Sequence, residues 1–327
     1  MSSNRSSHQK FNCLAIASPS FSKNKILVEE VRHLADRLII NSSGERLGEE
    51  QLSEFLKSSN ADAVIIGTDS LTAKVIESAK GLRAVGKYGV GLERVDTDAL
   101  RSKGIFFGYC AGVNRRSVSE LILGFILGHQ RNIFKSINRM QNGIWDKNGG
   151  SQLSEKTVGI VGFGNIGTDL ANLLQPFGCK IIAHDVLDKS EKLKQFNGEQ
   201  LSYRDLLQKA DVISFSVPGD DSTKHMFGNN ELTLVKPSAL VINTARGSVV
   251  DFDSISSAVR TNRISGYASD VFPLEPLNSN DYKVEDGFYF TPHIGGNAAE
   301  AILQMGRAAI ESLREFLASQ DNPHVRR

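Results

Sequence analysis

Short apolar runs alternate with stretches of helical periodicity along the first third of the chain. A run of β-branched and small apolar residues predicts a buried strand, whereas apolar residues three and four positions apart predict an amphipathic helix. The predicted strands are Cys13–Ala17, Leu38–Ile40, Ala63–Gly67, Ala84–Lys87 and Ile105–Gly108, and the predicted helices between them are Lys25–Leu34, Glu49–Ser58, Thr72–Ala79 and Val95–Lys103. This alternation indicates a parallel sheet with helices on its faces.

The same alternation returns after a long helical stretch. Residues Ser117–Met140 predict one amphipathic helix, with a face apolar enough to pack on a domain or on a second subunit. The strands predicted after it are Thr157–Val161, Lys180–Ala183, Val212–Ser216, Ala239–Asn243, Ser265–Ala268 and Phe288–Thr291. The segment Tyr109–Asn114 is a candidate hinge between two α/β domains. The last helical stretch, Ala298–Ala318, has no strand after it, so it either caps the second sheet or crosses back to the first domain.

A glycine-rich turn follows the predicted strand Thr157–Val161. Gly162 permits a tight turn, Gly164 lets the backbone approach a pyrophosphate, and Gly167 allows the next helix to pack closely on the strand. The turn alone is equally compatible with packing inside an α/β fold. The next strand, however, leads to Asp185, a carboxylate at the distance from the turn that suits the adenosine ribose. Together these features predict a dinucleotide site that prefers NAD, because Asp185 would repel the 2′-phosphate of NADP.

The composition limits which partners and which cellular compartment we expect. The 327 residues are 40% hydrophobic and 23% charged, with a net charge of +1 spread along the chain, so a small molecule is a better partner than nucleic acid or a membrane. Cys13, Cys110 and Cys179 are odd in number and far apart, which favours buried thiols in a reducing compartment and predicts neither disulfides nor a metal site. Met1–Lys10 resembles a disordered tail, and Leu121–Leu127 is too short to span a bilayer. We therefore expect a cytoplasmic protein.

Three later strand ends carry candidate catalytic groups. Arg246 offers a planar fork that can grip a substrate carboxylate and polarise the neighbouring carbonyl. His293 can exchange a proton near neutral pH, and Glu275 would favour its imidazolium form if it contacts the far ring nitrogen. Each of these residues alone is more often structural or solvated. Behind a nucleotide turn, the three together predict a nicotinamide-dependent enzyme that acts on a carbonyl or an alcohol.

An ordered set of motifs strongly resembles the NAD-dependent D-2-hydroxyacid dehydrogenases, the group that includes D-3-phosphoglycerate, glyoxylate/hydroxypyruvate and D-lactate dehydrogenases. The motifs are V-G-F-G-N-I-G at 161–167, S-V-P at 216–218, I-N-T-A-R-G at 242–247, D-V-F-x-x-E-P at 270–276 and T-P-H-I-G-G at 291–296. The resemblance implies two Rossmann-like, doubly wound parallel-sheet domains with the active site in a cleft between them. Residues 1–110 plus 297–327 would form a flavodoxin-like substrate domain that the last helix completes, and residues 111–296 an NAD-binding domain. Relatives dimerise through the NAD-binding domain, which gives the long helix a partner.

The same resemblance assigns roles to single residues. Arg246, Glu275 and His293 match the catalytic triad, and Tyr88, Gly89 and Val90 belong to a loop that, together with Arg246, would bind the substrate. Asp270 would hold the nicotinamide carboxamide. The complete set of expected NAD contacts is Gly162, Gly164, Asn165, Ile166, Gly167, Asp185, Val217, Pro218, Thr223, Thr244 and Asp270.

Departures from the family pattern bear on the substrate. Phosphoglycerate dehydrogenases often carry an Arg-Ser pair just after the third strand, where this chain has Ile66-Gly67-Thr68-Asp69. The loss of that cation, with Asp69 as an added acidic residue in the cleft, predicts weak use of a phosphorylated substrate. Glu93-Arg94 replaces an Asp-Asn pair, and Ser216 replaces a common His. Lys87 and Tyr88 either contact the distal group of the substrate or are solvated residues at a strand end.

Two other functions are compatible with these motifs. An NAD(H)-sensing binding protein of the corepressor type can keep the same triad, so this alternative stays open. Formate dehydrogenase shares the fold, but its relatives lack the Glu partner of the His, and Glu275 makes this alternative unfavourable.

Overall fold

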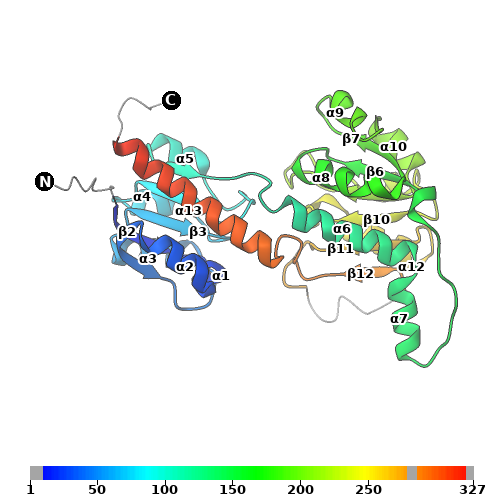
Figure 1. The fold of residues 1–327 in the computed structure, drawn as a ribbon, viewed down its shortest axis with the longest axis horizontal. Coiled ribbons are helices and arrows are strands. Elements are labelled where there is room, and N and C mark those ends of the chain that lie inside the picture. Colours follow the sequence, from blue (N-terminus) through cyan, green and yellow to red (C-terminus); the bar gives the residue numbers. More distant parts are fainter. Residues whose placement is uncertain (1–9, 278–285, 322–327) are drawn as a thin grey trace, which may run out of the picture. The chain divides into compact units, whose positions relative to one another are not determined.

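In a computed structural model that describes residues 10–277 and 286–321, the chain forms two compact units. One contains residues 1–114 and 299–327, and the other contains residues 115–298 (Figure 1). The expected division at residues 110 and 297 differs from this one by a few residues at each boundary. The expected tail, Met1–Lys10, lies outside the described residues except for Lys10.

The first unit is built on a five-stranded parallel sheet with strand order β2-β1-β3-β4-β5. Its strands are β1 (Phe11–Ile16), β2 (Ala35–Ile40), β3 (Ala63–Ile66), β4 (Ala84–Lys87) and β5 (Phe106–Gly108), and its helices before residue 109 are α1 (Pro19–Lys23), α2 (Lys25–Arg32), α3 (Glu49–Ser59), α4 (Ala73–Ser78) and α5 (Thr97–Ser102). The five predicted strands and four predicted helices are confirmed. The short helix α1 was not predicted.

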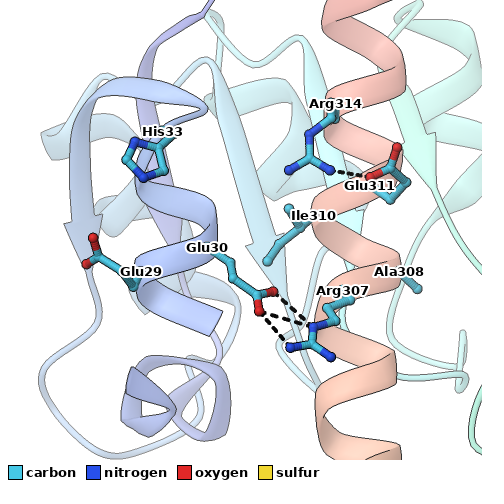
Figure 2. Close-up of a pocket in the computed structure, with 8 residues that line it drawn as sticks. All are labelled: Glu29, Glu30, His33, Arg307, Ala308, Ile310, Glu311 and Arg314. Atoms are coloured by element: carbon cyan, nitrogen blue, oxygen red, sulfur yellow. Dashed lines mark hydrogen bonds and ion pairs between the residues drawn. The ribbon is translucent and has the colours of Figure 1, made fainter. Parts of the chain in front are cut away.

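The last helix, α13 (Ala299–Asp321), packs on the sheet of the first unit. Ala309 and Leu313 belong to its buried core, and a Cβ on Gly86 of β4 would lie only 3.0 Å from the carbonyl oxygen of Ala309. Helices α2 and α13 lie side by side, joined by the ion pair of Glu30 with Arg307 at 2.8 Å (Figure 2). This hydrogen bond from Arg307 lowers the pKa of Glu30. The first unit is therefore discontinuous in sequence.

A surface groove of about 750 Å³ follows the seam between α2 and α13 (Figure 2). Each carboxylate that lines the groove is ion-paired, because Glu29 pairs with Arg32, Glu30 with Arg307 and Glu311 with Arg314. The groove thus offers no excess charge that would select a ligand.

The second unit contains a seven-stranded parallel sheet with strand order β12-β11-β10-β9-β6-β7-β8. Its strands are β6 (Thr157–Val161), β7 (Lys180–His184), β8 (Glu199–Gln200), β9 (Val212–Phe215), β10 (Leu240–Asn243), β11 (Gly266–Ser269) and β12 (Phe288–Phe290), and its helices include α8 (Asn165–Leu174), α9 (Ser190–Lys194), α10 (Tyr203–Lys209), α11 (Asn229–Leu232) and α12 (Phe252–Arg260). Strand order reverses between β6 and β9. In a doubly wound sheet, ligands bind beyond the carboxyl ends of the strands at such a reversal.

The prediction of one long helix over Ser117–Met140 is wrong. The chain forms α6 (Arg115–Gln130) and α7 (Ile133–Gln141), and Asn132 between them has a left-handed backbone with φ 52°. The Phe134 ring packs where a Cβ on Gly128 would lie, 2.2 Å away, and the backbone N–H of Ser151 bonds the last carbonyl of α6 at 2.7 Å. These contacts end α6 and redirect the chain.

The three cysteines are free thiols, but they differ in exposure. Cys13 is buried and Cys179 is half-buried, whereas Cys110 is exposed, so the expectation of three buried thiols is wrong for Cys110. Among the described residues, no helix combines the length and apolar character needed to cross a membrane.

Candidate active site

The candidate residues of the second unit gather along one edge of its sheet. All the strands are parallel, so the segments that follow them emerge on the same side. From β12 to β7, these segments carry His293, Asp270, Thr244 with Arg246, Val217 with Pro218, the glycine turn, and Asp185.

The three glycines of the turn lack a side chain for different reasons. A Cβ on Gly162, which has φ +92°, would lie 2.5 Å from the carbonyl oxygen of Ser216, and a Cβ on Gly167 would lie 2.3 Å from that of Gly162. Both are therefore required by the packing of the protein itself. Gly164, at the N-cap of α8, is exposed, and a Cβ there would meet nothing within 4 Å. The space beside Gly164 and the free N–H groups of α8 fit a pyrophosphate.

Asp185 ties the end of β7 to this turn. Its Oδ2 accepts a hydrogen bond from the backbone N–H of Phe163 at 2.8 Å, and its Oδ1 accepts one from Leu187 at 2.9 Å. The carboxylate is half-buried beside the glycine turn, where an adenosine ribose could reach it.

Polar groups near the middle of this edge are left without partners. The hydroxyls of Ser216 and Thr244 are buried and form no hydrogen bond among the described residues. Their positions are neighbours, because Phe215 pairs with Asn243 in the sheet. Buried hydroxyls usually find a partner, so this pair fits a site that a polar ligand completes. Thr223 instead donates to the carbonyl of Pro218 at 2.6 Å and shapes the loop after β9.

Glu275 and His293 are in direct contact. Glu275 Oε2 lies 2.6 Å from His293 Nδ1, and Glu275 Oε1 accepts the backbone N–H of Phe272 at 3.0 Å. A carboxylate accepts, so Nδ1 carries the proton of this bond and Nε2 is left for proton exchange. His293 has φ +55°, a left-handed conformation that costs a residue with a Cβ about 1 kcal/mol.

Asp270 holds the loop that carries His293, a role that the sequence did not reveal. It is 2% exposed, and it accepts hydrogen bonds from the Thr291 hydroxyl at 2.6 Å and from the backbone N–H groups of Ile294 and Gly295, both at 2.7 Å. Ser117 at the start of α6 supports the same loop by donating to the carbonyl of Gly295 at 2.6 Å. The strained His293 is thus held from both sides.

Arg246 lies at the end of β10, in a turn fixed by Asn243. The Asn243 side chain donates to the carbonyl of Arg246 at 2.9 Å and accepts the N–H of Ala245 at 3.1 Å. The aliphatic part of Arg246 packs on Gly219, where a Cβ would lie 2.3 Å from Arg246 Cγ. Asn243 and Gly219 therefore support Arg246, although the sequence motifs do not identify either one as a site residue.

The candidate substrate loop belongs to the first unit. Gly89, with φ +111°, and Val90 are half-buried, and the Tyr109 hydroxyl donates to the carbonyl of Val90 at 3.0 Å. Tyr88 is buried edge-on against Phe21 at 5.4 Å between ring centroids.

Two charged residues near this loop differ from expectation. Lys87 is 4% exposed and donates to the carbonyl of Gly67 at 2.7 Å, and Tyr88 is buried as well. The alternative that these two residues are solvated at a strand end is therefore wrong. Asp69 is completely buried and accepts the N–H groups of Leu47 at 3.0 Å and Gly67 at 2.9 Å. Asp69 therefore presents no charge to a substrate and does not disfavour a phosphorylated one, contrary to the expectation from the sequence.

The chain has two parallel α/β units, and one of them carries a glycine-rich nucleotide turn and a Glu-His pair at the same edge of its sheet. This combination is typical of nicotinamide-dependent oxidoreductases. Residues 123–295 match the model of the D-isomer specific 2-hydroxyacid dehydrogenase NAD-binding domain. The chain therefore belongs to the D-2-hydroxyacid dehydrogenase family, whose members use NAD to interconvert a D-2-hydroxy acid and its 2-oxo acid.

Individual relatives agree with this assignment. The chain is 35% identical to D-3-phosphoglycerate dehydrogenase of Haemophilus influenzae, across 89% of this chain and 71% of the relative. It is 32% identical to glyoxylate reductase of Thermococcus litoralis, across 80% of this chain and 82% of the relative. Its fold is similar to that of Aquifex aeolicus D-lactate dehydrogenase complexed with NAD and lactic acid, with a TM-score of 0.82 at 24% identity, across 96% and 97% of the two chains.

Proposed function

We propose that Arg246, Glu275 and His293 perform the chemistry of this NAD-dependent dehydrogenase. The observation that carries the proposal is the 2.6 Å contact of Glu275 with His293, on a loop that Asp270 holds in a strained conformation. Bound NAD supplies the hydride acceptor, or in its reduced form the hydride donor, at the substrate C2. The residues of this chain bind the substrate and move the proton.

His293 handles the proton through Nε2. When a 2-oxo acid is reduced, the imidazolium donates from Nε2 to the substrate oxygen, and it takes the proton back in the oxidation. Glu275 keeps the ring in one orientation and stabilises the imidazolium through Nδ1. Arg246 binds the carboxylate of the substrate and polarises the neighbouring carbonyl.

Replacing His293 by Ala tests the assignment. We expect turnover to fall by about 10²- to 10⁴-fold, the range supplied by general acid–base catalysis, while the Kd for NADH stays within about twofold. Glu275→Gln keeps a hydrogen-bonding partner but loses the charge, so its turnover should be intermediate and its pH profile displaced. Near-normal turnover of His293→Ala would contradict the proposal.

We also propose which residues contact NAD. Gly164, Asn165, Ile166 and the α8 N-terminus would cradle the pyrophosphate, with Gly162 and Gly167 shaping the turn. Asp185 would bind the adenosine ribose, Val217 and Pro218 would line the adenine pocket, and Thr244 with the unpartnered Ser216 hydroxyl would complete the middle of the edge. Thr223 would order the loop after β9, and Asp270 would also meet the nicotinamide carboxamide.

The substrate is proposed to be a small 2-oxo acid without a phosphate group. Residues 66–69 at the end of β3 carry no cationic side chain, and the ammonium of nearby Lys87 is buried against the Gly67 carbonyl. The loop N–H groups near Gly89 and Val90 would bind the substrate carboxylate. Initial rates of NADH oxidation, with NADPH in parallel, would be compared across glyoxylate, hydroxypyruvate, pyruvate, phosphohydroxypyruvate and 2-oxoglutarate. A kcat/KM highest for phosphohydroxypyruvate would reject this substrate class, and poor turnover of every 2-oxo acid despite tight NADH binding would favour the NAD(H)-sensing alternative.

We also propose a homodimer formed through the second unit. Helix α7 has no buried residue, and Ile133, Ile137 and Met140 are 43%, 51% and 54% exposed on one of its faces. Apolar residues that gather on one face of a helix are typical of a protein contact. The dimer is proposed to work in the cytoplasm.

A further inference from the structure

Gln200, the last residue of β8, holds the loop that follows Asp185. Its Nε2 donates to the carbonyl of Leu187 at 2.9 Å and to that of Asp185 at 3.2 Å. Its Oε1 accepts the backbone N–H of Lys189 at 2.6 Å. One side chain thus uses both its donor and its acceptor groups to fasten residues 185–189 to the edge of the sheet.

Apolar burial does little to fasten this loop. Val186 is 94% exposed and Leu187 is 61% exposed, so the loop gains almost nothing from apolar burial. Segments with few buried contacts open at low free-energy cost unless hydrogen bonds restrain them. Residues 185–187 are restrained by Gln200 and by Asp185 itself, whose carboxylate bonds Phe163 and Leu187. At the end of the loop, Asp188 and Lys189 also accept hydrogen bonds from the backbone of α9.

The position of Gln200 is itself fixed by strand pairing. Gln200 lies opposite Ala183 in the parallel pair of β8 with β7, and the N–H of Leu201 bonds the carbonyl of Ala183 at 2.8 Å. The short strand β8 therefore places the Gln200 amide beside the loop.

We infer that Gln200 is a positioning residue for cofactor choice, which rests on the proposed contact of Asp185 with the adenosine ribose. With the loop fastened, the Asp185 carboxylate stays beside the glycine turn, where it would face the ribose, and the backbone of Lys189 stays bonded to Gln200. Without the Gln200 amide, the carbonyl of Asp185 and the backbone of Lys189 lose these bonds, so the loop can shift, the Asp185 carboxylate can move from the ribose, and the Lys189 ammonium can approach a 2′-phosphate. Gln200 thereby favours NADH over NADPH without touching either.

Calorimetric titration of the full chain with NADH and with NADPH tests this inference in Gln200→Met, which keeps the side-chain length but forms none of these bonds. We expect NADH to bind about 3- to 10-fold more weakly, in line with the loss of one or two net hydrogen bonds. NADPH affinity should stay the same or rise, so the preference for NADH should fall at least about threefold. Exchange of the Lys189 amide hydrogen should become faster, and kcat at saturating NADH should change by less than about twofold.

Gln175→Met is the matched control. Gln175 donates a single exposed hydrogen bond to the carbonyl of Gln195 at 2.8 Å and does not contact residues 185–189, so both affinities should stay at the wild-type values. Gln200→Glu is a second variant, used if Gln200→Met does not fold. It keeps the acceptor for Lys189 but loses both donated bonds, and it should weaken NADH binding in the same direction.

The variant Asp185→Asn distinguishes a failure of the proposed ribose contact from a failure of the positioning role of Gln200. Unchanged NADH affinity in this variant would reject the proposed ribose contact and with it the inference. If Asp185→Asn weakens NADH binding while Gln200→Met and Gln200→Glu leave the NADH-to-NADPH preference unchanged, the ribose contact stands and the role of Gln200 is overturned.

Discussion

Gly164 differs from the other glycines of the nucleotide turn in what it leaves empty. Gly162 and Gly167 face backbone atoms of this chain, whereas the space beside Gly164 is open. The sequence does not distinguish the three glycines, because each of them fits the spacing of a glycine-rich nucleotide turn. The structure separates those required for folding from the one whose missing Cβ leaves room for a ligand.

Gly164→Ala should therefore damage binding but not the fold. A Cβ on Gly164 would meet nothing within 4 Å and φ is negative at −81°, but ψ of −146° lies outside the usual α and β regions, so we expect the melting temperature to fall only slightly, by about 4 °C or less. The added methyl group would lie where the pyrophosphate approaches, and we expect the Kd for NADH to rise about 10-fold or more, as measured by calorimetric titration.

The control for this substitution is Gly124→Ala in α6, where a Cβ also meets nothing within 4 Å. It should leave NADH affinity unchanged. Wild-type affinity in Gly164→Ala would show that the turn does not approach the cofactor.

At the same scale, residue types were easier to predict than their contacts. The motifs located Glu275, His293 and Asp270 in the sequence, but the three hydrogen bonds that Asp270 accepts depend on how β11 and β12 pair, which no local pattern specifies. Asp69 and Lys87 were misjudged for the same reason. Their charges are satisfied by backbone groups of Gly67, and the sequence does not show that these groups converge.

At the scale of elements, strands and helices with strong periodicity were predicted, and the exceptions have physical causes. Strand β8 has only two residues, too few for a pattern, although it carries Gln200. The break between α6 and α7 was missed because the apolar periodicity continues through it. The residues that end α6, Phe134 and Ser151, act through contacts across the turn.

Helix α7 gives a prediction about assembly. Its apolar face carries Ile137, which is 51% exposed, and we expect Ile137→Glu to weaken the dimer at least about 10-fold, because a charge would be buried at the contact. Sedimentation velocity over a concentration series would measure the change. Asn138→Glu, one position around the same helix, is the control and should remain dimeric. A wild-type chain that stays monomeric at micromolar concentration would reject the interface.

At the scale of the whole molecule, the two units should respond differently to acid. In the second unit, burial lowers the pKa of His129 to about 4, while its ring contacts Tyr289 and Ser265. The unfolded chain binds a proton near pH 6.5, so protonation favours unfolding as the pH falls from 6.5 to 4. In the first unit, the hydrogen bond from Arg307 lowers the pKa of Glu30. The contribution of this ion pair to the free energy of unfolding therefore persists to a lower pH, and it is lost only as the pH falls through the lowered pKa of Glu30.

The second unit should consequently lose stability first on acidification. The His129 shift corresponds to at most about 3 kcal/mol between pH 6.5 and pH 4. Differential scanning calorimetry at pH 7, 5.5 and 4.5 should show one transition moving to lower temperature before the other. In His129→Gln, which can still bond Tyr289 and Ser265 but does not titrate, that transition should move much less over the same range. The neutral amide in this variant cannot take up the proton that His129 binds when the unit unfolds. If the variant and the wild type were equally sensitive to pH, groups other than His129 would therefore govern the response to acid.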